Sequence, residues 1–532
     1  MVSAKEHYEE MLEITRRLAE KEPNNDRLQR DLTEKLNNVG EMLRMGGDLI
    51  GAKKYYEELL GIIRRLAVND PSNDRLHMGL RANLDRMGDL LKTSGDLAGA
   101  KSHCKESLDI ARRLAVKEPN DDQQQLNLSG SLDNVGDLLQ MSGDLTGARQ
   151  HYDESLEIMR RLVEKDTDND QWQGGLTISL NNLASILKMD GDLPNARKHY
   201  EESLAITRQL AMKYPSNNQR QLTLSGCLDR LGDCLRKSDD TSGAKEHYEE
   251  SLAIMRHLVE KEPNNDHLLR GLTISLNNLA NIQGISDDLP GAKQHYEESL
   301  EIIRQQAMQD PSNDQRQLNL SGSLDRIGDF LRMTDDLPGA RQYYDESLEI
   351  MRRLVAKDSN NDHWQQGLTV SLDQIGGVLG MSGDPNGAKQ HYEESLEIMN
   401  RLVIKDPNNN RWQHGMADCY TKLGFVERDL GDLSEAKRLF EKAIDIFVKY
   451  FGSDYPKLAQ IYSYLSLVEQ DLSNPEAAID LCRSAFLIFL QCEQYERARQ
   501  ELTWLVKNDP NAKEFLAEIG ITLPEEDKPE TP

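Results

Sequence analysis

Histidine recurs at one fixed position along this chain of 532 residues, and imidazole nitrogen is a common ligand for zinc. The histidines lie 48 or 96 residues apart: His7, His103, His151, His199, His247, His295 and His391. Equivalent side chains on neighbouring packed helices are about 8 to 10 Å apart, whereas zinc ligands each lie about 2 Å from the ion. The spacing therefore favours a packing role over a shared metal site.

A second pattern, formed by Asp166, Asp168 and Asp170, copies the beginning of a calcium-binding loop. Gln171 and Thr177 stand where such a loop needs glycine and glutamate. The sequence also lacks a glycine-rich phosphate loop, a nucleophile elbow and a paired-cysteine motif. Because every polar column repeats with one period and none converges, we expect a protein that is not an enzyme and uses no cofactor or metal.

Asparagine or aspartate occupies one mid-helix position in eight consecutive repeats, although both are mediocre helix formers. We call this set the polar ladder: Asn37, Asp85, Asp133, Asn181, Asp229, Asn277, Asp325 and Asp373. The next position, here the flanking column, carries amides or arginines: Asn38, Arg86, Asn134, Asn182, Arg230, Asn278, Arg326 and Gln374. At about 100° per residue both columns lie opposite the leucine stripe of their helix, so we expect them to face outward along one side of the array.

The polar ladder has two interpretations of similar weight. In the structural interpretation, it is a solvated face copied by duplication, or its side chains bond across to the next hairpin. In the functional interpretation, it hydrogen-bonds the backbone of an extended peptide, since asparagine offers a donor and an acceptor. In the peptide interpretation the carboxylates favour a partner rich in lysine and arginine. The peptide-binding residues are then Asn37, Asp85, Asp133, Asn181, Asn182, Asp229, Arg230, Asn277, Asn278, Asp325, Arg326 and Asp373.

The helices that carry these columns belong to a repeat of 48 residues, marked by one alanine. It occurs at Ala4, Ala52, Ala100, Ala148, Ala196, Ala244, Ala292, Ala340, Ala388 and Ala436. In residues 23–71, leucines three or four positions apart predict a first helix capped by Asp26. A second helix is expected over about 49–68, after a glycine pair and the capping Asp48, and ends before Pro71. Each unit is a helical hairpin, so the fold class is all-α, an α-solenoid.

This unit resembles the tetratricopeptide repeat family, in which two small residues, an aromatic residue and a closing proline keep fixed positions. They are Gly40, Ala52, Tyr56 and Pro71 in one unit, then Gly136, Ala148 and Tyr152, then Gly232, Ala244, Tyr248 and Pro263, and then Gly328, Ala340 and Tyr344. The resemblance covers about residues 1–510. With its long repeats the chain is similar to the arrays of kinesin light chains and of bacterial multi-repeat proteins. It implies a right-handed superhelix whose first helices form an inner groove, where asparagine ladders hold peptide backbones.

A slower period of 96 residues runs through the middle of the array. Segments starting at Gln125, Gln221 and Gln317 share the pattern QLxLSGxLDxxGDxL, and those starting at Gly175, Gly271 and Gly367 share GLTxSL. This alternation indicates that pairs of repeats were duplicated. We therefore expect a binding surface that alternates between two chemistries.

We divide the chain into four parts. Residues 1–22 are expected to be the second helix of an incomplete first repeat, and 23–451 tandem 48-residue repeats. Residues 452–520 are expected to form a divergent shorter repeat with capping helices, and 521–532 a disordered acidic tail. The open first repeat indicates a lone capping helix or a start inside a longer array, and we favour the second.

The net charge of -27 disfavours nucleic acid and anionic membranes as partners, because both require clustered lysine and arginine. The charged N-terminus lacks the apolar core of a signal peptide, and the longest apolar run is too short to span a membrane. We expect a cytoplasmic scaffold that binds a protein partner, a basic or extended peptide. The alternatives are a sensor or regulatory segment of a signalling ATPase or protease, and a structural array that self-associates through its N-terminal end.

Overall fold

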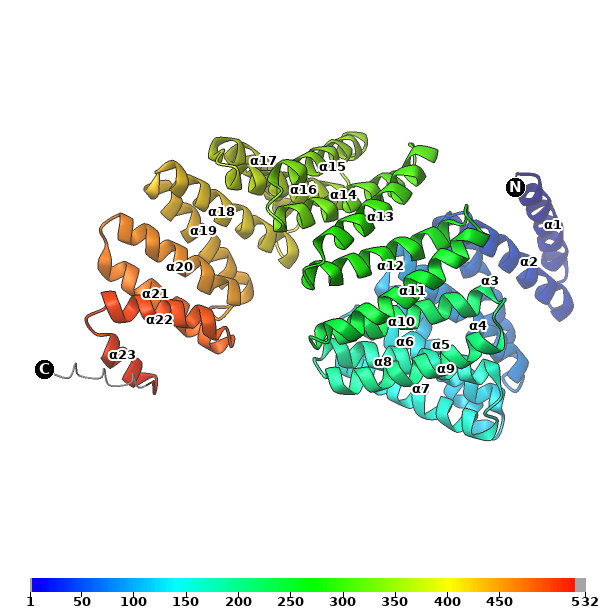
Figure 1. The fold of residues 1–532 in the computed structure, drawn as a ribbon. Coiled ribbons are helices and arrows are strands. Elements are labelled where there is room, and N and C mark those ends of the chain that lie inside the picture. The colour runs from blue at the N-terminus through cyan, green and yellow to red at the C-terminus, as the bar shows by residue number, and fades with distance from the viewer. Residues whose placement is uncertain (1, 522–532) are drawn as a thin grey trace, which may run out of the picture. The chain divides into compact units, whose positions relative to one another are not determined.

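The computed structural model describes residues 2–521, apart from the side chains of residues 2–6, 8 and 9. All the regular elements in that range are α-helices, which confirms the predicted all-α class. The chain divides into two compact units, Met1–Ser286 and Asp287–Pro532. Each unit is a run of consecutive helices packed as antiparallel neighbours, as the colour gradient of Figure 1 shows.

The first unit contains α1 (Val2–Lys21), α2 (Asp26–Met45), α3 (Leu49–Asn69), α4 (Asp74–Ser94), α5 (Leu97–Lys117), α6 (Asp122–Met141), α7 (Leu145–Lys165), α8 (Asp170–Met189), α9 (Leu193–Lys213), α10 (Asn218–Lys237), α11 (Thr241–Lys261) and α12 (Asp266–Ile285). Its hairpins pair α2 with α3, and so on to α10 with α11. Even-numbered helices are therefore the first helices of the repeats.

The second unit contains α13 (Leu289–Gln309), α14 (Asp314–Met333), α15 (Leu337–Lys357), α16 (Asp362–Met381), α17 (Pro385–Lys405), α18 (Asn410–Leu430), α19 (Leu433–Phe451), α20 (Pro456–Asp471), α21 (Pro475–Gln491), α22 (Tyr495–Asn508) and α23 (Ala512–Glu518). Here the hairpins pair α14 with α15, α16 with α17, α18 with α19 and α20 with α21.

Short polar side chains set where the helices begin. The side chain of Asn25 accepts hydrogen bonds from the backbone nitrogens of Arg27 and Leu28, so α2 begins at Asp26. The sequence placed this cap one residue late, because both adjacent residues are good cap formers and only the geometry selects one. In the tight turn before α3, Gly47 has a φ of 83°, and Asp48 accepts from the nitrogen of Gly51 at 2.8 Å.

The recurring alanine and tyrosine form the core of most hairpins, with Cys104 and Phe440 in the place of the tyrosine in two of them. Ala148 and Tyr152 are both 0% exposed. The tyrosine ring lies against Gly136 of the first helix, where a Cβ atom would be 2.5 Å from ring carbon Cε1. Glycine at this position therefore allows the close approach of the two helices. The same contact occurs at Gly40, Gly232, Gly328 and Gly376.

Ion pairs connect successive second helices within each unit. An arginine on one second helix contacts a glutamate 42 residues later, on the next. Their nitrogen–oxygen distances are 2.5 to 2.8 Å. The pairs are Arg16 with Glu58, Arg64 with Glu106, Arg112 with Glu154, Arg160 with Glu202, Arg208 with Glu250, Arg304 with Glu346 and Arg352 with Glu394. These side chains are partly exposed, so each pair contributes modestly to stability.

The last helices share an aromatic core that includes Phe440, Phe447, Phe486 and Phe489. The acidic tail expected to be disordered lies outside the described residues from position 522 onward. Within residues 2–521, no helix is long and apolar enough to cross a membrane.

Candidate functional site

The polar ladder lies on the first helices from α2 to α16, and its residues are half-buried. In several repeats a ladder residue contacts the flanking position of the next repeat, as when Arg86 Nη1 donates to Asn37 Oδ1 at 2.9 Å, 49 positions away. The contacts join Asn37 to Arg86, Asp85 to Asn134, Asp133 to Asn182 and Asp229 to Asn278 in the first unit, and Asp373 to Lys422 in the second. The ladder thus connects adjacent hairpins in addition to forming part of the wall of the array.

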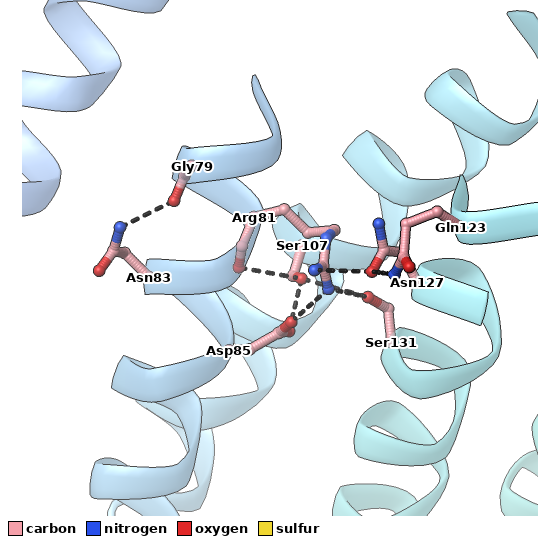
Figure 2. A network of polar contacts seen from close by, with 8 residues as sticks. All are labelled: Gly79, Arg81, Asn83, Asp85, Ser107, Gln123, Asn127 and Ser131. Atoms are coloured by element: carbon pink, nitrogen blue, oxygen red, sulfur yellow. Dashed lines mark hydrogen bonds and ion pairs between the residues drawn. The ribbon is translucent and has the colours of Figure 1, made fainter. Parts of the chain in front are cut away.

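Asp85 illustrates how a ladder carboxylate is held. Ser107 Oγ on the paired second helix donates to Asp85 Oδ1 at 2.5 Å, and Arg81 Nη1 donates to Oδ2 at 2.7 Å. Arg81 also donates from Nη2 to Asn127 Oδ1 at 3.2 Å, which lies on α6 (Figure 2). Asp85 and Arg81 together therefore link three helices of two hairpins.

Buried serines lie behind the ladder in alternate repeats. The hydroxyl of Ser155 is 2.8 Å from that of Ser129 and 2.9 Å from that of Ser179. The same triad recurs 96 residues later as Ser225, Ser251 and Ser275, and part of it as Ser321 and Ser347. These hydroxyls account for the serines in the 96-residue pattern, since they satisfy one another inside the core.

Burial raises the pKa of the ladder carboxyls. The pKa of Asp133 rises to about 7, and the pKa values of Asp229 and Asp325 rise to about 6. In each case burial outweighs the nearby serine hydroxyls, which favour the charged form. In the described part of the chain, one oxygen of each of these carboxyls is buried without a hydrogen-bond partner. Those oxygens face the protein interior rather than a partner.

A third polar column, one position after the central glycine, also serves the core in alternate repeats. Its acids accept hydrogen bonds from the tyrosine of the paired second helix at 2.7 to 2.8 Å. The pairs are Tyr56 with Glu41, Tyr152 with Asp137, Tyr248 with Asp233 and Tyr344 with Asp329. These acids hold the buried tyrosine hydroxyls.

The flanking column is more open than the ladder. Its arginines are exposed, and its asparagines are half-buried: Arg86, Arg230 and Arg326, and Asn182 and Asn278. Four of the twelve proposed peptide-binding residues belong to this column, and the structure leaves the exposed guanidinium groups of Arg230 and Arg326 best placed for a partner. Asn181 and Asn277 are half-buried like the ladder carboxyls, and the side-chain oxygen of Asn181 is buried without a partner among the described residues.

Exposed aliphatic residues lie one turn before the flanking column in alternate repeats. Ile178, Ile274 and Val370 are 56%, 49% and 47% exposed. Glycine takes the same position in the intervening repeats, at Gly130, Gly226 and Gly322. The sequence analysis did not predict these exposed residues. The isoleucine or valine of GLTxSL lies off the leucine stripe, which indicates an aliphatic side chain outside the core.

Hollows open between consecutive first helices, at related places in the repeat. One of about 480 Å³ lies between α8 and α10, and one of about 440 Å³ between α10 and α12. Others of about 380 Å³ and 460 Å³ lie between α2 and α4 and between α16 and α18. Ladder and flanking residues line each of them, including Asn37, Arg86, Asn181, Asn182, Asp229, Arg230, Asp373 and Gln374.

The histidine column lies on the second helices, away from these hollows. Burial lowers the pKa of His103, His199 and His391, and their Nδ1 atoms are buried. Within the described residues, no group of three or more histidine, cysteine, aspartate or glutamate side chains is placed to hold a metal ion.

The stacked hairpins and their repeated wall define an α-solenoid. The tetratricopeptide repeat family matches residues 415–489 and also residues 128–168, 177–211 and 320–363. The repeats in these segments are therefore identified as tetratricopeptide repeats. The matched repeats support the class of protein-interaction scaffold or sensor repeat for this chain.

Three solved structures are similar to this chain. The apo form of RapI is 11% identical, with a TM-score of 0.50, over 78% of this chain and 99% of that chain. A signal transduction ATPase with a tetratricopeptide repeat sensor, from Pyrococcus horikoshii, is 13% identical, with a TM-score of 0.43, over 75% and 55% of the two chains. BtubC from P. vanneervenii is 20% identical, with a TM-score of 0.39, over 49% and 92%. No curated protein matches the chain.

Proposed function

We propose that this chain is a non-enzymatic scaffold that holds an extended segment of a partner protein along the wall formed by its first helices. The observation that carries the proposal is the series of hollows between consecutive first helices. A surface that recurs along the array suits an extended partner, because each stretch of the partner meets a similar set of groups.

In this proposal the flanking column contacts the partner and the polar ladder supports it from behind. Asn182 and Asn278 each offer a donor and an acceptor, as a peptide backbone requires. Asp133 and Asp229 lie on the buried side of these two amides and orient them. Half-buried side chains held in this way lose little conformational freedom on binding, which favours affinity.

A steric block tests the proposal. Gly226 lines the hollow between α10 and α12, and a Cβ atom there would contact only the flexible end of Arg230, at 3.4 Å. Gly226→Tyr should therefore fill the hollow without disturbing the core. Gly61→Tyr is the matched control, because Gly61 is exposed on the second helix α3 with open space around it.

The measurement uses peptides selected by the wild-type chain from a random library of 15-residue sequences. We expect Gly226→Tyr to weaken the selected peptides at least about tenfold, a loss of about 1.4 kcal/mol. Gly61→Tyr should change their affinity less than about twofold, about 0.4 kcal/mol. Unchanged binding by Gly226→Tyr, or a library that yields no binding peptide, contradicts the proposal.

A further inference from the structure

We infer that the wall formed by α8, α10 and α12 selects an acidic partner segment in which two aliphatic side chains flank the carboxylates. This inference rests on the proposed function and specifies the partner. It starts from Arg230, which lines both the hollow between α8 and α10 and the hollow between α10 and α12.

The apolar part of the wall consists of two separated points. Ile178 lies in the first hollow and Ile274 in the second, and each is about half exposed. Gly226 occupies the equivalent position on α10, between the two isoleucines, and has no side chain to fill the wall there. The guanidinium of Arg230 lies beside it, and its Nη1 donates to the Gly226 carbonyl oxygen at 3.3 Å. A cation thus lies between two aliphatic contact points.

Three arginines make this part of the wall cationic. Arg220, Arg230 and Arg270 line the two hollows. None of the three forms an ion pair with another residue of the described chain. By contrast, Arg208 on the neighbouring second helix is 2.5 Å from Glu250. The arginines of the wall are therefore available to an external carboxylate.

The carboxylate that lines these hollows forms no ion pair with the three arginines in the described structure, although the charge of Arg230 counteracts the rise in its pKa. Asp229 is the one acidic residue among the side chains lining the two hollows in the described structure. It faces Ser251 and Asn278, and its Oδ1 is buried. The basic partner expected from the net charge and from the ladder carboxylates is therefore replaced, at this wall, by an acidic one.

The spacing of the two isoleucines sets the spacing of the partner's side chains. Ile178 and Ile274 are two repeats apart. Packed helices lie about 8 to 10 Å apart, so two steps span about 16 to 20 Å. An extended chain covers that distance in about five or six residues, at about 3.3 Å per residue. The partner segment therefore carries leucine, isoleucine or valine at both ends of such an interval, with aspartate or glutamate within it.

The test uses labelled synthetic peptides and fluorescence anisotropy with the full chain. The reference peptide carries two leucines six positions apart with three glutamates between them, in a serine and threonine background. Companion peptides replace the glutamates with glutamine or lysine, or the leucines with serine. We expect the wild-type chain to bind the reference peptide at least about tenfold more tightly than the lysine peptide, with the difference shrinking as salt rises.

Matched variants locate the effect. Arg230→Gln should reduce the preference for glutamate over glutamine, and Ile178→Ser should weaken the leucine peptide but not the serine peptide. Arg161→Gln is the control, because Arg161 is exposed on the second helix α7 and the change in net charge is the same. Gly226→Tyr should weaken every peptide that occupies the wall.

The outcomes separate this inference from the proposed function. Equal affinity for acidic, neutral and basic peptides, all sensitive to Gly226→Tyr, overturns the inference and leaves the scaffold function standing. A loss with Arg161→Gln as large as that with Arg230→Gln also overturns it, because the effect then reflects net charge. Failure of every peptide, including library peptides, overturns both.

Discussion

The carboxyl group of Asp133 on α6 lies against Ser155 on α7, at the buried side of the polar ladder. Burial raises the pKa of this carboxyl to about 7, although the hydroxyl favours the charged form. Aspartate in an unfolded chain titrates near 3.9. The folded state therefore binds the proton more tightly, and the free energy of unfolding decreases as the pH rises from about 4 to about 7.

Asp133→Asn should remove this pH dependence. The pKa difference sets a ceiling of about 4 kcal/mol for the gain above pH 7, and we expect about 1 to 2 kcal/mol because water reaches the half-buried ladder. Asparagine already occupies this position as Asn181 and Asn277. Scanning calorimetry at pH 4 and pH 8 checks the prediction: the variant should gain stability at pH 8 only. The exposed loop variant Asp168→Asn should show no such difference, and an equal gain at both pH values contradicts the buried-carboxyl explanation.

Gly136→Ala should destabilise its hairpin, because the added methyl group meets the ring of Tyr152. Overpacking costs about 1 to 3 kcal/mol, and Ala184 at the same place in another hairpin favours the lower end. Gly130→Ala on the same helix meets open space and should stabilise the helix by up to about 1 kcal/mol. Urea unfolding compares the two. Shifts of the same sign would show that the close approach to the tyrosine is unimportant.

Arg112→Gln should cost little, because the ion pair with Glu154 is partly exposed, with 47% and 42% of the two side chains accessible. We expect about 0.2 to 1 kcal/mol at low salt and almost nothing in 1 M sodium chloride. A double-mutant cycle with Glu154→Gln isolates the pair. A coupling that survives high salt is inconsistent with a screened surface interaction.

Arg483→Met should cost much more, because one of the two ion pairs it breaks is with a buried carboxylate. Asp509 is 6% exposed, and its carboxylate Oδ2 is 2.6 Å from Arg483 Nη2. Loss of the arginine leaves a buried charge, for which we expect about 3 to 5 kcal/mol of local destabilisation. Hydrogen exchange should report it in α21 to α23 and not in the first unit. Adding Asp509→Asn to Arg483→Met should restore part of the protection from hydrogen exchange, because the buried charge is removed. If the double variant recovers no protection, lost packing and not the buried charge causes the effect.

The helices could be predicted from the sequence because their causes are local. Leucines at steps of three and four, and a capping Asp48 after Gly47, fix a hairpin within one 48-residue block. The close approach at Gly136 was also predictable, since a glycine and a tyrosine keep the same separation in many repeats. The cap at Asn25 was misplaced by one residue, because two adjacent residues can both cap a helix.

The candidate site could be predicted only in part. Helical periodicity placed Asp229 and Arg230 on the outward side of their helix, but it did not separate the half-buried carboxyl from the exposed guanidinium. Nor did it show that Ile178 is exposed on the same wall.

The sequence by itself thus determined the repeat, the hairpin and the columns of residues that share a helix face. Only the tertiary structure decided which column is covered, which carboxyls are turned inward and where the hollows open. The physical reason is that these properties depend on contacts with residues 22 to 49 positions away, such as Ser107 for Asp85 and Arg86 for Asn37. Such contacts are set by how successive hairpins stack, and no single helix contains that information.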